Sequence, residues 1–222
     1  MEDLSPTPRS TVGRGSARAR ADRSELHAFL ADALVAHLGV VVDGDPVVLP
    51  TAYALAVDGP DDGGTLYLHG SVAARWLREA PARTVCVTVT ELDGLVAARS
   101  GFHHSMNYRS AVVQGTARVV TDPAERALAL DAIVDHMVPG RSATLRPATR
   151  KELAATAVLA VPLRESSLKV RSGGAKDDPS DVARGGWAGH VPLRRSAGRP
   201  VADDDVRTGV PDDVLARAAA LA

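Results

Sequence analysis

The 222-residue chain has little of several features that would place it in a well-known class. It contains one cysteine, Cys86, which excludes an intramolecular disulfide framework and a cysteine zinc cluster and is typical of a reducing compartment. Its formal net charge of -1 argues against a general nucleic-acid binder, because such modules carry a basic excess. No run of about 18 apolar residues is present. We therefore expect a cytoplasmic protein with no nucleic-acid or membrane partner.

The hydrophobic share of 45% is enough to build one core, which we expect within residues 24–172. Residues 1–23 are rich in Ser, Pro and Arg and predict a disordered arm. Residues 173–195 are mostly polar, apart from a short apolar stretch that contains Trp187. Residues 196–222 form a tail with a weak helix.

Three stretches have helical spacing or helix-start residues. Apolar residues recur at steps of three and four within 24–38, and Ser71 opens a second helix over 71–79 that Pro81 ends. Asp122 is a predicted N-cap, followed by proline and by glutamate at the capping-box position. The expected buried stripe of this third helix is Ala127, Leu130, Val134 and Met137.

The remaining regular segments have the alternation or β-branched composition of strands. Asp43-Gly44 predicts a hairpin turn, and Asp93-Gly94 predicts a second turn between the strands 83–91 and 95–99. In 65–69 and 108–120 the alternation places apolar side chains on one face. This pattern predicts a mainly β protein with peripheral helices (α+β), folded as an antiparallel barrel. No Gly-x-Gly-x-x-Gly follows a strand, so nothing supports a dinucleotide fold.

Two strand ends carry polar residues that the fold does not need. At His69-Gly70-Ser71 a strand runs into a helix start, which is a natural anion site, and Arg75 lies on the same helix face as Ser71. The alternative is a plain N-cap with solvated arginines. Arg109 heads a core-facing row, which predicts a position at the barrel rim where it can reach an anion or water, and we expect it to hold a phosphate; Ser110 points to the opposite face.

Two further groups attract attention for their residue types. His103 and His104 are adjacent, so their side chains point apart, and no carboxylate pattern accompanies them; we expect loop histidines and no metal site. Trp187 lies in an otherwise polar segment and is expected to fold back onto the protein's own surface or onto a ring-bearing ligand.

Segments 66–71 with 74–77, 106–117 and 187–193 together resemble the flavin-nucleotide-binding branch of the pyridoxamine 5'-phosphate oxidase-like split barrels. This branch includes the nitroimidazole-resistance reductases. The resemblance runs from about residue 24 to 193. It implies an antiparallel split β-barrel that forms a homodimer and binds FMN in the cleft between subunits. The residues that match its cofactor-binding positions are Pro50, Thr51, Tyr53, His69, Gly70, Ser71, Arg75, Arg109, Ser110 and Trp187.

The sequence also departs from the true oxidase. The oxidase has an Arg-Lys pair where this chain has Ala74-Arg75, and a more basic strand where this chain has the neutral Pro50-Thr51. We therefore expect an FMN-dependent oxidoreductase of a small molecule, similar to a nitroreductase, and not a pyridoxamine 5'-phosphate oxidase. His69 is the candidate proton donor; the alternative is a rim histidine that only packs beside the cofactor.

Two other functions stay open. One is a non-catalytic flavin-binding or sensing protein. The other is a related barrel that uses a deazaflavin or a haem, in which case His103 and His104 are the candidate axial ligands.

Overall fold

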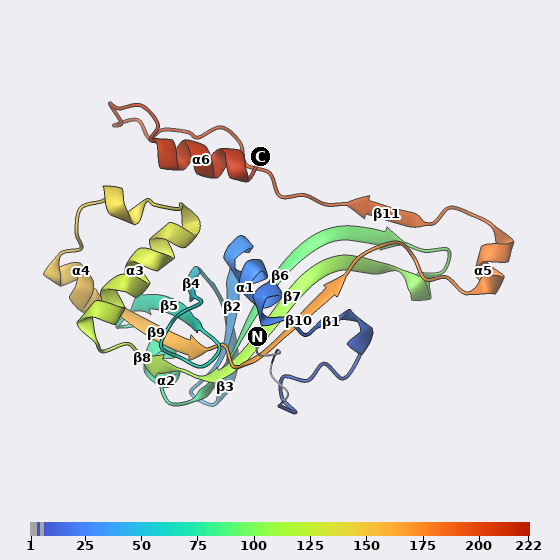
Figure 1. Cartoon of the computed structure of the whole chain (residues 1–222), viewed down its shortest axis with the longest axis horizontal. Helices are drawn as coiled ribbons and strands as arrows, with labels where there is room; N and C mark the ends of the chain where they lie inside the picture. The colour runs from blue at the N-terminus through green and yellow to red at the C-terminus, as the bar shows by residue number, and fades with distance from the viewer. Residues whose placement is uncertain (1–3, 5–6) are drawn as a thin grey trace.

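The computed structural model of the chain describes residues 4 and 7–222 (Figure 1). They form two antiparallel sheets. The larger has the strand order β1-β10-β7-β6-β2-β3, with β11 paired to β6, and the smaller has the order β4-β5-β9-β8. The strands are β1 Ala19–Arg20, β2 Ala36–Val42, β3 Asp45–Thr51, β4 Tyr53–Ala56, β5 Thr65–Ser71, β6 Thr84–Ala97, β7 Ser105–Thr116, β8 Arg118–Val119, β9 Thr156–Pro162, β10 Glu165–Arg171 and β11 Gly189–Pro192.

Helices lie on both faces of the smaller sheet. The α-helices are α1 Arg23–Asp32, α2 Arg75–Glu79, α3 Pro123–Met137, α4 Arg150–Ala155, α5 Pro179–Arg184 and α6 Asp212–Ala220, and the 3-10 turns are η1 Ser16–Arg18, η2 Gly101–His103 and η3 Ser142–Thr144. The mainly antiparallel β architecture with peripheral helices is as predicted. Within the described part of the chain, no helix has the length and apolar character needed to cross a bilayer.

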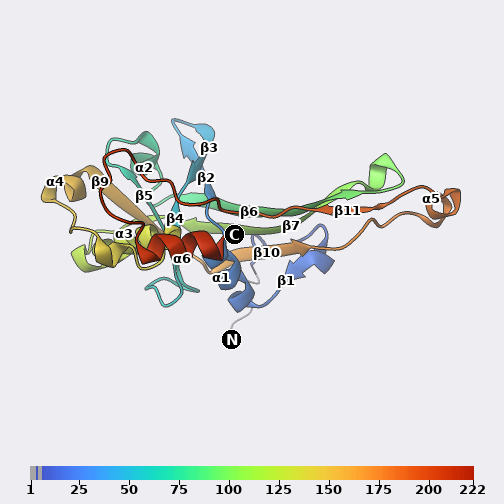
Figure 2. The same ribbon diagram turned by 90° about the horizontal axis from the view of Figure 1, so that it is seen from above.

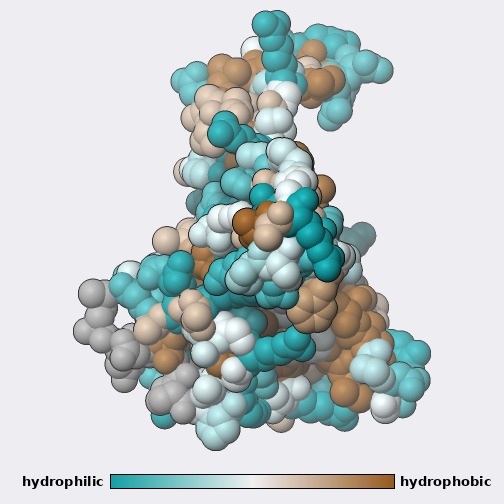
Figure 3. Space-filling model, turned by 90° about the vertical axis from the view of Figure 1, so that its right-hand side faces the viewer, coloured by the Kyte–Doolittle hydropathy of each residue, from teal (hydrophilic) through white to brown (hydrophobic). Residues whose placement is uncertain are grey.

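The molecule consists of a lobe and a long arm (Figures 1 and 2). The lobe contains the smaller sheet, α3 and α4, whereas the arm is formed by the far halves of β6 and β7, by β11 and by α5 at its tip. Seen towards the arm's end, hydrophilic side chains alternate with apolar patches on the surface (Figure 3). Exposed apolar side chains of the arm are Leu92, Leu95, Phe102, Met106, Trp187 and Val191.

The first predicted hairpin is confirmed. Asp43 and Gly44 both have positive φ, 53° and 92°, and join β2 to β3 in a two-residue turn of the type that matches strand twist.

The second predicted hairpin is wrong. β6 is one continuous strand along β7, and Asp93-Gly94 is a β-bulge at which the register shifts. Gly94 is needed there because a Cβ would lie 2.9 Å from the carbonyl oxygen of Val191 on β11. The bulge turns the Asp93 side chain towards Arg109.

Two predicted helices are shorter than expected. α1 ends at Asp32 because Ala36 to Val42 is the strand β2, and its N-cap is Asp22 rather than Ser24. α2 begins at Arg75, with Ala74 as N-cap, since Ser71 is still the last residue of β5. A short loop separates Ser71 from Arg75, so the helix start predicted at Ser71 is wrong.

The predicted disordered arm, residues 1–23, lies partly outside the described residues. In its described part, β1 pairs with β10, and the Arg9 guanidinium forms an ion pair with Glu165. Residues 7–20 therefore lie along the edge of the larger sheet.

Both faces of the smaller sheet are buried, which explains why residues 65–68 are all buried. One face packs against the main core with Leu26, Phe29 and Leu30 of α1, and the other packs against Ala129 and Ile133 of α3. The N-cap bond predicted at α3 is confirmed, since the Asp122 carboxylate accepts from the Glu125 N–H at 2.7 Å. The predicted stripe is displaced, because Ala129 and Ile133 are the buried residues.

Candidate functional site

A cavity of about 660 Å³ lies in the lobe, between α3 and the segment from η3 to α4. Most of its walls are apolar side chains, and α3 supplies one side of them. It is lined by His69, Leu130, Asp131, Ile133, Val134, Met137, Ser142, Leu145, Arg146, Pro147, Ala148, Glu152, Leu153 and Thr156. Leu130, Val134 and Met137, predicted as the buried stripe of α3, are thus the wall of a cavity.

His69 brings an unpaired polar group to this cavity. It lies on β5 opposite Val158, on the same face as Tyr67, which is the alternation that the sequence predicts. Its Nδ1 atom is buried and has no hydrogen-bond partner among the described residues. Burial lowers the pKa of the imidazole below its usual value, so the ring is neutral at neutral pH. A neutral imidazole without an internal partner is suited to bind a metal or a ligand.

Arg146 places a cation at the rim of the cavity. Its guanidinium donates to both carboxylate oxygens of Glu152, at 2.6 and 2.9 Å. Glu152 also completes a capping box with Thr149 at the start of α4. The hydrogen bonds from Arg146 and then from Thr149 lower the pKa of Glu152 to about 2. Arg146 is two-thirds exposed and keeps donors free for an anion at the rim.

Arg109, by contrast, is held by carboxylates of its own chain. Its guanidinium donates to both oxygens of Asp93 and, at 3.0 Å, to Asp32, and it lies over the Phe29 ring at 5.4 Å. The hydrogen bond that Arg109 donates to Asp93, more than any other contact, raises the pKa of Arg109. Arg195 joins the same group through Asp32 and Glu91.

The predicted anion site at Ser71 and Arg75 lies away from Arg109. Arg75 forms an ion pair with Asp43 at the β2–β3 turn, and the Ser71 Oγ accepts from the Ala73 N–H at 3.2 Å. Gly70 is needed for packing, because a Cβ there would lie 2.9 Å from the Trp76 and Leu77 side chains.

The register of the larger sheet separates the two motifs within one chain. Arg109 pairs with Glu91 of β6, close to Val89, which pairs with the first residue of β2. Arg75 contacts the turn at the other end of β2. A strand of this length separates the two arginines by roughly 20 Å. A single phosphate therefore cannot contact both arginines of the same chain.

The other predicted cofactor residues are spread over both sheets. Tyr53 is fully buried, and its hydroxyl donates towards the carbonyls of Leu30 and Ala33 at 2.6 and 2.9 Å. Pro50 and Thr51 end β3, while the Ser110 Oγ lies 3.0 Å from the Thr90 Oγ1 on β6.

Trp187 and the paired histidines lie on the arm. Trp187 is 70% exposed and its ring packs against Gly189 at the start of β11. The His104 Nδ1 lies 2.9 Å from the Ser100 carbonyl oxygen, and His103 faces Asp178 of the α5 segment. Neither histidine lines the cavity of His69.

The sequence model of the pyridoxamine 5'-phosphate oxidase family matches residues 22–170, which is more than half of the chain. The chain belongs to this family. The flavocytochrome Anf3 from Azotobacter vinelandii is 36% identical, with a TM-score of 0.87 over 96% of this chain and 97% of that chain. The FAD and haem binding protein from Mycobacterium smegmatis is 40% identical, with a TM-score of 0.82 over 90% and 97% of the two chains.

Two other similarities are weaker. A candidate 5-nitroimidazole antibiotic resistance protein from Bacteroides thetaiotaomicron is 22% identical, with a TM-score of 0.55 over 68% of this chain and 86% of that chain, and shares the fold. The phthioceranic/hydroxyphthioceranic acid synthase of Mycobacterium tuberculosis is 36% identical over 94 residues, which make up 39% of this chain and 4% of the synthase. Because that stretch is so small a part of the synthase, it identifies no shared activity.

Proposed function

We propose that the chain is an electron-transfer protein of this family that binds a haem in the His69 cavity and a flavin at a separate site. The observation that carries the proposal is the unpaired His69 imidazole in an apolar cavity. Two relatives of similar length support it, since one is described as a flavocytochrome and the other as an FAD and haem binding protein.

The residues of the cavity fit a haem. Its volume lies within the range of about 300–1,000 Å³ that is usual for cofactor pockets. Leu130, Val134 and Met137 offer an apolar surface for a porphyrin, and Arg146 offers a cation for its carboxylates. His69, neutral and unpaired, would hold the iron through a ring nitrogen. The candidate residue to hold the iron is therefore His69 and not His103 or His104.

A bound haem would supply one-electron chemistry, and the protein would supply its position and its surroundings. His69 would hold the iron as a neutral imidazole, a state that its lowered pKa favours. The apolar side chains of α3 would keep water away from the group and so influence its potential.

The flavin site that we propose is completed by a second copy of the chain. Arg75 and Arg109 of one chain lie at opposite ends of β2, so a cleft that uses both motifs needs one from each of two subunits. This arrangement is a homodimer with the flavin between subunits and a small-molecule substrate beside it. The relative from Mycobacterium smegmatis is described as binding FAD, so we expect FAD in preference to the FMN predicted from the sequence.

The experiment is spectroscopy on the purified protein after reconstitution with haem and with either flavin. We expect a haem Soret band, and yellow flavin that denaturation releases for identification by mass. His69→Ala should abolish the Soret band and retain flavin, whereas the matched variant His104→Ala should keep both. A His69→Ala protein that binds haem like the wild type would refute the haem site, and a wild type that binds neither flavin would refute the flavin part.

A further inference from the structure

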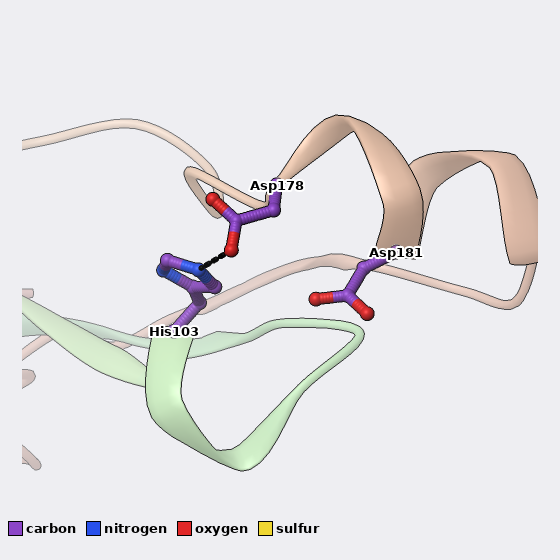
Figure 4. A group of neighbouring side chains, drawn as sticks. All are labelled: His103, Asp178 and Asp181. Atoms are coloured by element: carbon purple, nitrogen blue, oxygen red, sulfur yellow. Dashed lines mark ion pairs between the residues drawn. The ribbon is translucent and has the colours of Figure 1, made fainter.

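Three side chains of the types that ligate metals lie together at the tip of the arm, away from the lobe that contains His69. His103 ends η2 in the connection between β6 and β7, whereas Asp178 and Asp181 belong to the α5 segment (Figure 4). One ligand atom from each of the three lies within 4.8 Å of the others. Figure 4 shows the imidazole and both carboxylates directed towards a common space.

His103 is fixed in this position with an unpaired nitrogen. Its side chain is 20% exposed, and the Phe102 ring packs edge-on against the imidazole at a centroid distance of 5.1 Å. The Nε2 atom is buried and makes no hydrogen bond within the described residues, although the Asp178 carboxylate lies 3.3 Å away. Two atoms that each lie about 2.0–2.1 Å from a tetrahedral zinc are themselves roughly 3.3 Å apart. The spacing of Nε2 and carboxylate is therefore that of a ligand pair.

The carboxylates of the group are poorly neutralised by the protein. The neighbouring Asp177 is satisfied, because Arg99 binds it at 2.7 Å, and so it is not a candidate ligand. Asp181 is 19% exposed, and Arg184 approaches it only to 3.7 Å from an 81% exposed position. Two carboxylates that have no close cationic partner leave negative charge that a divalent cation would balance.

We propose that His103, Asp178 and Asp181 form a binding site for a divalent transition metal such as zinc. One imidazole and two carboxylates leave a coordination position for water or another ligand. The site is independent of the flavin and the haem. It joins the tip of the β6–β7 hairpin to α5 and thereby holds the segment that carries Trp187 and β11 along the arm.

The test is calorimetric titration of the chelator-treated full chain with zinc, and with cobalt to follow the visible bands of a protein-bound ion. We expect one zinc per chain at this site and a rise in melting temperature. His103→Ala and Asp181→Asn should weaken zinc binding by about tenfold or more, because each removes one of three ligands.

Two matched variants separate this site from other histidines. His104→Ala alters the adjacent imidazole, and His69→Ala alters the proposed haem ligand; both should bind zinc like the wild type. Zinc binding that is unchanged in folded His103→Ala and Asp181→Asn proteins, or absent from the wild type, would overturn the proposal. In that case the group is only a side-chain contact between His103 and Asp178.

Discussion

His69 and Arg109 were both predicted to contact a cofactor, and the structure gives them opposite surroundings. Arg109 has its guanidinium occupied by Asp32 and Asp93, whereas His69 has a buried nitrogen with no partner among the described residues. His136 completes the comparison: burial also lowers its pKa, but its Nε2 donates to the Ala33 carbonyl at 2.7 Å. A group that is satisfied within the chain supports the fold, and an unsatisfied one in a cavity indicates a ligand.

The largest expected effect comes from His69→Leu. We expect haem affinity to fall by more than about 100-fold, because the iron loses its protein ligand. Spectroscopic titration with haem measures this loss.

The same variant should not destabilise the protein without cofactors. It removes an unsatisfied buried nitrogen, so the free energy of unfolding should stay equal or rise by about 1 kcal/mol. Urea unfolding checks this, and a clear loss of stability would show that His69 is part of the folded framework.

Arg109→Met should have the opposite effects on stability and on haem affinity. We expect the free energy of unfolding to fall by about 1–2 kcal/mol, since Asp32 and Asp93 lose their shared cation at a partly exposed site. Haem affinity should remain unchanged. Arg75→Met is the matched control, because its ion pair with Asp43 is mostly exposed and should contribute less. Flavin affinity should fall in both variants, because both arginines belong to the proposed flavin cleft, and unaltered stability of Arg109→Met would mean that its ion pairs with Asp32 and Asp93 do not support the fold.

The smallest expected effect is at the cavity rim. Arg146→Met should raise the pKa of Glu152 from about 2 towards the ordinary value of 4.5, without reaching it, because the Thr149 cap remains. The folded pKa lies below the unfolded one, so the stabilisation is present above about pH 4.5 and is lost as the pH falls towards 2. NMR titration of the Glu152 carboxyl measures the shift, and no shift would mean that the ion pair does not form in solution.

The sequence predicts features that a few neighbouring residues determine. The hairpin at Asp43-Gly44 needs only a turn that accepts positive φ, and the start of α3 needs only Asp122 and its own first turn. Asp93-Gly94 has the same composition as a turn but is a bulge, because β7 continues beside β6 through this point. Whether such a dipeptide turns or bulges depends on a strand that lies elsewhere in the chain.

The site depends on contacts that no local pattern contains. Alternation correctly placed His69 on one face of β5, but the cavity that it lines is closed by side chains of α3 and α4, more than 60 positions later. Arg109 has a core-facing position as predicted, yet its partners Asp32 and Asp93 come from α1 and from the bulge. The spacing of Leu130, Val134 and Met137 predicts a buried helix face, but no local pattern shows that this face lines a cavity.

The pairing of β1 with β10 has a consequence for how the protein is made. Ala19 lies opposite Lys169, so the two strands are separated by about 150 residues of chain. During synthesis at about 5–20 residues per second, β1 has no partner for several seconds after it leaves the ribosome. Its docking must follow the assembly of β6, β7 and β10, because such distant strands pair only after a large loss of chain entropy. We therefore expect β1 to be added to the edge of the larger sheet after β10 is in place.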